Sequence, residues 1–139
     1  MGLMTAEQYK QSLRDDRVVY YCGEKVEDVT THPYLKVCVE TASTDYRMAE
    51  MPEYRDLAVT NDPKTGEPIS RYYYTPQNSE DLLKRHELMV TGTRLANGMI
   101  PFPHDIAADS MNAVLITANT MGNKEYAERA ENFLNYLRK

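Results

Sequence analysis

Apolar side chains recur at intervals of three and four residues along most of the chain, a spacing typical of helices that bury one face. Because few stretches alternate in the way of a β-strand, we expect a mainly helical fold. The predicted helices are residues 5–15, 34–51, 52–58, 78–98, 105–122 and 123–139. In the second of them, one helical stripe carries Leu35, Cys38, Val39, Ala42, Tyr46 and Ala49.

Residues typical of helix ends support several of these boundaries. Thr5 and Gln8 stand at the positions of a capping box, in which each side chain bonds to the other residue's backbone N–H. Asn78 or Ser79 is a suitable N-cap for the long fourth helix, and Gly98 is a suitable stop.

Three segments predict other local structures. Residues 17–28 place β-branched and aromatic residues on both sides of Cys22–Gly23, which indicates a small β-hairpin. Residues 60–68 are rich in turn formers and predict a surface excursion. Residues 69–76, "ISRYYYTP", predict an extended segment that buries one tyrosine ring and leaves its neighbours at the edge.

Composition and charge narrow the class of protein. The chain has 139 residues and a net charge of -5, which suits one compact domain over residues 1–139. Basic residues are interleaved with acidic ones, so a nucleic acid is not an expected partner. No stretch is apolar enough to suggest a membrane span or a secretory signal, and we expect a cytoplasmic protein. Cys22 and Cys38 are then expected to be reduced thiols in the core or half-buried.

The side chains most suited to a functional site lie in residues 98–114, "GMIPFPHDIAADSMNAV", where prolines interrupt the helical pattern. His104 and Asp105 could orient or protonate a substrate oxygen. The plainer interpretation is that Asp105 caps the next helix while His104 lies in solvent. Asp105 and Asp109 beside His104 could also face a metal, but no second histidine follows at a fixed spacing, and we expect no metal site.

The other histidines have structural interpretations. His32 precedes a proline in a turn and is expected to hold that turn, and His86 lies among charged residues on a solvated helix face. No glycine-rich phosphate loop, and no nucleophile paired with a base, stands out in the sequence. We therefore assign no catalytic residue.

Longer strings carry a resemblance to a known family. The opening "TAEQYKQSLRDDRVVYYCGEKVEDVTTHP" resembles the start of the 4-hydroxyphenylacetate 3-hydroxylase and 4-hydroxybutyryl-CoA dehydratase flavoprotein family. The likeness continues through "YRMAEMPEYRDL", "GEPISRYYYTPQNSEDLLKR" and "DSMNAV". It implies the helical N-terminal domain of an acyl-CoA-dehydrogenase-like fold, with the central β domain and the C-terminal helical bundle absent from this chain.

The resemblance also implies a function. Family members assemble as dimers of dimers around FAD, which the domains absent here would mainly bind, so no flavin-binding residue is assigned. The loop 101–105 would form one wall of the substrate pocket, with Phe102, His104 and Asp105 as substrate-binding residues. In the dehydratases this region supplies two cysteines to an iron-sulfur cluster, but their positions fall on Pro101 and Asp105, so no cluster is expected.

Three functions follow from these observations. The first is a domain of an FAD-dependent aromatic hydroxylase that is inactive alone. The second is a domain of a 4-hydroxybutyryl-CoA dehydratase/vinylacetyl-CoA isomerase relative without the cluster cysteines, acting on a CoA ester. The third is a stand-alone helical interaction module, or one subunit of a split enzyme, since a domain cut from an assembly exposes the apolar surface that its neighbours covered.

Overall fold

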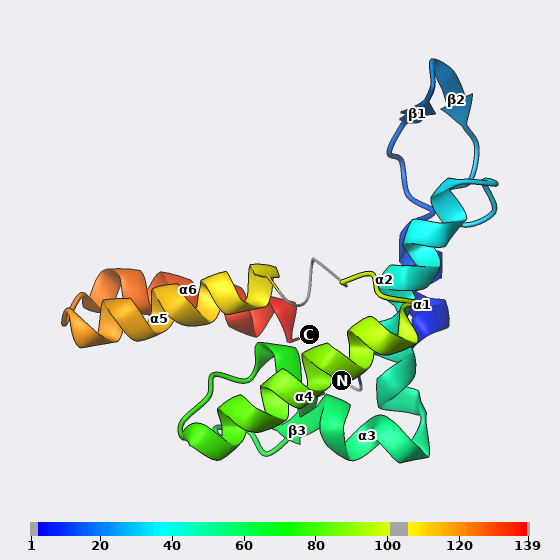
Figure 1. Cartoon of the computed structure of the whole chain (residues 1–139). Coiled ribbons are helices and arrows are strands. Elements are labelled where there is room, and N and C mark those ends of the chain that lie inside the picture. The colour runs from blue at the N-terminus through cyan, green and yellow to red at the C-terminus, as the bar shows by residue number, and fades with distance from the viewer. Residues whose placement is uncertain (1–2, 101–105, 139) are drawn as a thin grey trace.

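Helices form most of the computed structural model, which describes residues 3–100 and 106–138 (Figure 1). The helices are α1 (Ala6–Ser12), α2 (Leu35–Glu50), α3 (Pro52–Ala58), α4 (Ser79–Leu95), α5 (Ala108–Thr120) and α6 (Lys124–Leu137), with a short 3-10 helix, η1 (Arg71–Tyr73). The strands are β1 (Val19–Tyr21), β2 (Glu24–Val26), β3 (Val59–Asn61) and β4 (Pro68–Ser70). The mainly helical fold class is confirmed. Among the described residues, no helix combines the length and apolarity needed to cross a bilayer.

The first helix and hairpin form as their local sequences predict. Thr5 and Gln8 make the capping box, although α1 ends at Ser12, before the expected Asp15. Antiparallel strands β1 and β2 pair Tyr21 with Glu24 across a two-residue turn. Both turn residues have positive φ, 50° at Cys22 and 86° at Gly23. That is the geometry of the tight hairpin turn whose twist matches the strands.

A second hairpin corrects the prediction for residues 60–76. Strands β3 and β4 pair antiparallel, with Thr60 opposite Ile69, so the excursion is the hairpin's loop. Only the start of the expected extended segment is a strand, because Arg71–Tyr73 turns into η1. Tyr72 is buried while its neighbouring tyrosines are half-buried, as the sequence suggested.

The core lies where α2, α3, α4 and η1 meet. Its buried members are Met48, Ala49, Ala58, Tyr72, Leu88 and Ala108. Helix α2 contacts this core through Met48, which was not part of the stripe predicted from the sequence. The buried face of α2 is therefore rotated from that stripe, and Cys38 is exposed. Cys22 is exposed as well, and both thiols are free, which corrects their expected burial.

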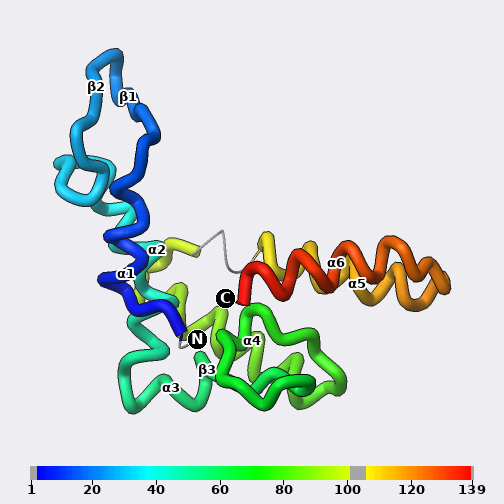
Figure 2. The backbone as a smooth tube through the Cα atoms, turned by 180° about the vertical axis from the view of Figure 1, so that it is seen from behind, coloured from blue at the N-terminus to red at the C-terminus, as the bar shows by residue number. Residues whose placement is uncertain are grey.

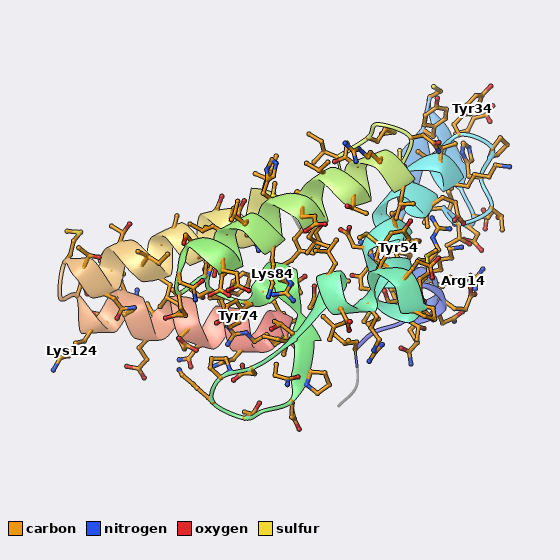
Figure 3. All side chains as sticks on the ribbon, turned by 60° about the horizontal axis from the view of Figure 1, so that its bottom comes forward. Arg14, Tyr34, Tyr54, Tyr74, Lys84 and Lys124 are labelled. Atoms are coloured by element: carbon orange, nitrogen blue, oxygen red, sulfur yellow. The ribbon has the colours of Figure 1, made fainter. Side chains whose placement is uncertain are left out.

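Helices α5 and α6 form a hairpin with its own small core of Leu115, Ala130 and Leu134. Figures 1 and 2 both show this hairpin extending away from α1, α2 and α3, with the chain's C-terminal end at its base. The β1–β2 hairpin extends from the other side of the molecule, beyond α1 and α2 (Figure 2). In Figure 3, Lys124 marks the far tip of the α5–α6 hairpin.

Candidate functional site

The substrate-binding residues predicted from the sequence, Phe102, His104 and Asp105, lie outside the described residues, as does Pro101. The structure describes what flanks them. Met99 and Ile100 precede the loop, and the chain after it leads into α5. Residues 100 and 106 are thus the described residues nearest to the predicted site along the chain.

The segment before the loop lines an apolar groove beside α1 and α2, of about 460 Å³. Tyr9 and Leu13 come from α1 and the chain just after it, and Leu35 comes from the start of α2. Met99 and Ile100 close the groove, where the Thr41 hydroxyl lies 3.8 Å from the Met99 sulfur. This groove offers shape and apolar contact but little polar chemistry.

The helix after the loop lines a different groove, which we name the α4–α5 groove and which measures about 570 Å³. Its lining residues are Pro76, Gln77, Asn78, Leu82, Arg85, His86, Met89, Asp109, Asn112, Ala113 and Ile116. The chain before residues 101–105 thus lines an apolar groove, and the chain after them lines a groove that also carries charged side chains.

Arg85 is the central polar side chain at the α4–α5 groove, and it is only 4% exposed. Its Nη1 donates hydrogen bonds to the carbonyl oxygens of Tyr72 at 2.8 Å and Arg71 at 3.3 Å. Its other nitrogens pair with the Asp109 carboxylate. The guanidinium also lies 5.6 Å from the centre of the Tyr72 ring. One side chain of α4 thus fixes both η1 and the first turn of α5.

A second buried polar contact, between η1 and α2, lies against Gly92 of α4. The Tyr72 hydroxyl donates to Oδ1 of Asp45 on α2 at 3.2 Å. Gly92 lets α4 approach this pair, because a Cβ there would lie 3.3 Å from Asp45 Oδ1 and 3.4 Å from the Tyr72 hydroxyl. Burial and the charge of Asp45 raise the pKa of the neighbouring Tyr73 to about 12, so its hydroxyl stays protonated at neutral pH.

Polar contacts also anchor the base of the α5–α6 hairpin. Arg138 donates to the Tyr73 carbonyl at 2.8 Å and lies 3.3 Å from the buried Asp62 carboxylate. Burial alone would raise the pKa of Asp62, but backbone N–H donors in its turn and the Arg138 charge hold it below its usual value. On α5, the Asn112 amide oxygen accepts from the Thr75 hydroxyl at 2.8 Å.

Two buried side-chain nitrogens in this region, Arg85 Nη2 and Asn112 Nδ2, have no hydrogen-bond partner among the described residues, although Arg85 Nη2 takes part in the ion pair with Asp109. A buried amide without an acceptor costs about 1–3 kcal/mol. Within the part of the chain that the structure describes, the turn of α5 that faces the groove therefore carries an unused donor.

The other two histidines, His32 and His86, have different surroundings. His32 is structural as predicted, since its Nδ1 accepts the backbone N–H groups of Tyr34 and Leu35 at 3.3 Å. His86 is exposed, as expected for a solvated helix face, although it also lines the α4–α5 groove. Within residues 3–100 and 106–138, no three histidine, cysteine, aspartate or glutamate side chains cluster to hold a metal.

Arg85, Asp62 and Arg138 were missed by sequence reasoning. A usable signal existed only for Arg85, which falls on the same helical stripe as the buried Leu88 and Gly92. A cation within an apolar stripe indicates a buried partner. Asp62 and Arg138 meet across more than seventy residues of chain, and nothing local in the sequence marks that pairing.

Comparison with known proteins identifies the fold's relatives. The family model described as "4-hydroxyphenylacetate 3-hydroxylase N terminal" matches residues 5–139. The chain belongs to this family. Over 138 residues it is 33% identical to 4-hydroxybutyryl-CoA dehydratase/vinylacetyl-CoA-Delta-isomerase of Clostridium aminobutyricum, covering 98% of this chain and 28% of that protein. It is 30% identical to the oxygenase component of 4-hydroxyphenylacetate 3-monooxygenase from a Geobacillus strain, covering 99% of this chain and 28% of that protein.

Solved structures agree with the family assignment. The oxygenase component of 4-hydroxyphenylacetate 3-monooxygenase, solved with FAD, matches with a TM-score of 0.80 and 29% identity, over 96% of this chain and 28% of that one. An archaeal 4-hydroxybutyryl-CoA dehydratase from N. maritimus matches in fold with a TM-score of 0.82 at 21% identity, over 98% of this chain and 27% of that one. The family resemblance and the helical N-terminal-domain fold are both confirmed. The chain spans little more than a quarter of the length of these relatives.

Proposed function

We propose that this chain is the N-terminal helical domain of an FAD-dependent enzyme that resembles the oxygenase component of 4-hydroxyphenylacetate 3-monooxygenase. The observation that carries the proposal is the family match over almost the whole chain, against a relative whose structure holds FAD. Because the chain spans about 28% of that relative, the domain is inactive alone and works with the remaining domains or with a second chain. The parent is a homo-oligomer.

In this proposal the loop 101–105 forms one wall of the substrate pocket. Phe102 supplies apolar contact, while His104 and Asp105 orient or protonate a substrate oxygen. The two flanking grooves support the assignment, since the segment before the loop offers apolar surface and the helix after it offers Asp109 beside Arg85. Neither groove supplies a reacting group by itself.

The described residues do not fit a flavin site on their own. Arg85, which could face a diphosphate from the α4–α5 groove, already pairs with Asp109 and two backbone carbonyls. A bound flavin would supply redox chemistry, and the protein around it supplies orientation and electrostatics. We therefore assign flavin binding mainly to the part of the parent outside these residues.

The first test is mass spectrometry of the protein isolated from its native host, with an absorbance spectrum of the same sample. We expect a polypeptide with a mass above 16.0 kDa, or a bound second chain, together with the absorbance spectrum of a flavin. A 16.0 kDa chain that runs alone and colourless would contradict the proposal.

The loop is tested in the intact enzyme by His104→Ala. Loss of a proton donor or orienting group lowers kcat/KM by about 10²–10⁴-fold. Asn132→Ala, on the solvent face of α6, is the control and should leave turnover unchanged. Unchanged substrate affinity and turnover in the His104 variant would exclude a substrate-binding role.

Two other functions rest on specific observations. The 33% identity to a 4-hydroxybutyryl-CoA dehydratase/vinylacetyl-CoA-Delta-isomerase supports a CoA-ester lyase relative, without an iron-sulfur cluster because Pro101 and Asp105 cannot be thiolate ligands. Iron and sulfide analysis of the purified parent, with a CoA-ester assay, distinguishes it from the hydroxylase. A stand-alone interaction module or split-enzyme subunit is supported by exposed apolar residues on α5 and α6. It predicts a separate partner chain in the isolated sample.

A further inference from the structure

Helix α5 has an uncharged solvent-facing surface, which is unusual for a helix at the protein surface. From Ser110 to Met121 the sequence contains no charged residue. The exposed members of this stretch are Ser110, Ala113, Val114, Ile116, Thr117, Asn119, Thr120 and Met121. Val114 is 49% exposed, Ile116 48% and Met121 75%. Beyond the first turn, which holds Asp109, α5 therefore presents exposed apolar side chains with no charge among them.

Helix α6 provides an internal comparison within the same hairpin. Its exposed positions include Lys124, Glu125, Glu128, Arg129 and Asn132, so charged residues lie along its solvent side. Glu125 and Arg129 form an ion pair there. The two helices share one small core, and α6 differs from α5 in carrying charged residues on its solvent side, although it also exposes Tyr126, Phe133 and Tyr136. The lack of charge from Ser110 to Met121 is therefore the feature that distinguishes α5 from α6.

A surface that covers α5 must be apolar and uncharged. A charged partner would lose its hydration against α5 without gaining an opposite charge, which costs several kcal/mol. The apolar side of the α4–α5 groove continues this surface, since Ala113 and Ile116 line it together with Leu82, which is 57% exposed. The charged residues Arg85 and Asp109 of the same groove pair with each other. The unsatisfied Nδ2 of Asn112 lies on the same helix. A contiguous exposed apolar surface of this kind marks a site of contact with another protein segment.

We propose that the solvent-facing side of α5, with the adjoining α4–α5 groove, docks an uncharged apolar surface of the family polypeptide that lies outside these 139 residues. This rests on the proposed function, and it names the surface through which the domain meets the rest of the parent. The length of the relatives supports this occupant, because nearly three quarters of the matched dehydratase lies outside the aligned part. Interfaces between domains of one chain bury about 600–1,500 Å².

The test places a photo-crosslinking amino acid, p-benzoylphenylalanine, at Thr117 in the protein made in its native host. The same residue at Asn132 on α6 is the matched control, because both positions are exposed on neighbouring helices. Crosslinked peptides are identified by mass spectrometry. We expect the probe at Thr117 to join a peptide that resembles the part of the family relatives outside the matched region, with a yield at least tenfold above Asn132.

A charge variant tests the chemistry of the surface. With the probe at Ala113, one helical turn from Thr117, Thr117→Lys should lower the crosslink yield about tenfold, as expected for a loss near 1.4 kcal/mol. Because Thr117 is exposed, the thermal midpoint of the isolated chain should stay unchanged. A lowered midpoint together with the lost crosslink would assign the effect to folding and overturn the docking proposal.

Other outcomes also decide the question. Crosslinks to a second copy of residues 1–139, crosslinks to an unrelated protein, no crosslink, or equal yields at Thr117 and Asn132 would each overturn the proposal. The flavin spectrum of the same sample separates this inference from the proposed function. If flavin is present but the expected crosslink is not, the proposed flavin-dependent function stands and the docking surface on α5 is excluded. If the crosslink forms but no flavin is present, the docking surface stands and the proposed flavin-dependent function is excluded.

Discussion

Replacing Arg85 by methionine tests whether this buried cation holds η1, α4 and α5 together. Methionine keeps the apolar stem and fills much of the space, but it removes the donors to the Tyr72 and Arg71 carbonyls. A hydrogen bond to a charged donor contributes about 1.5–3 kcal/mol, and the 3.3 Å bond to Arg71 is the weaker. The Asp109 side chain is 47% exposed, so loss of the ion pair adds little. We expect a destabilisation of about 3 kcal/mol.

Urea denaturation followed by circular dichroism at 222 nm measures this loss. For a chain of this length, about 3 kcal/mol also lowers the thermal midpoint by about 10 °C. Arg94→Met on the exposed face of α4 is the control and should change stability by less than about 0.5 kcal/mol. Asp109→Asn should cost only about 1 kcal/mol, because it keeps an acceptor for Arg85. An Arg85→Met protein as stable as the Arg94 control would refute the reasoning.

Three further predictions concern other contacts. Gly92→Val should destabilise the protein by about 2 kcal/mol in urea denaturation, because a branched side chain cannot fit against Asp45, and an unchanged midpoint would show that α4 can move aside. Cys22→Asn should stabilise the β1–β2 hairpin by about 0.5 kcal/mol, because asparagine tolerates the positive φ better, and a lowered midpoint would contradict this. The pKa of Asp62 is lowered from 3.8 on folding, so its contribution to stability is present above that pH and is lost as the pH falls through the lower folded-state pKa. Asp62→Asn should therefore flatten the acid side of the stability–pH curve, and a parallel curve would refute the assignment.

Local signals in the sequence predicted most of the helices because their causes are local. Thr5 and Asn78 form the expected N-caps, and spacing alone located the long helices. The β3–β4 hairpin was missed because residues 62–67 separate its strands, whereas the equally short β1 and β2 flank the two-residue Cys22–Gly23 turn that marks a hairpin. The rotation of α2 toward Met48 is set by packing against α3 and α4, which no periodicity within α2 records.

Less of the candidate site than of the fold could be predicted from the sequence. The family resemblance directed attention to Phe102, His104 and Asp105, whose assignment stays a prediction. The contacts that organise the flanks of that loop were not anticipated. Arg85 and Arg138 each bind backbone carbonyls of η1, and a carbonyl acceptor leaves no trace in the identity of the residue that offers it. Sequence reasoning finds paired side chains more readily than side chains paired with backbone.

The polar contacts at η1 and the uncharged face of α5 have a joint consequence. Arg85 to Asp109, Thr75 to Asn112 and Arg138 to the Tyr73 carbonyl all tie the α5–α6 hairpin to the segment around η1. If α5 is the surface that meets the rest of the parent, these contacts set the angle at which it is presented. Arg85→Met should then reduce the crosslink from Thr117 even at temperatures where the variant is fully folded, whereas Arg94→Met should not. An undiminished crosslink would show that docking holds α5 in place without help from η1.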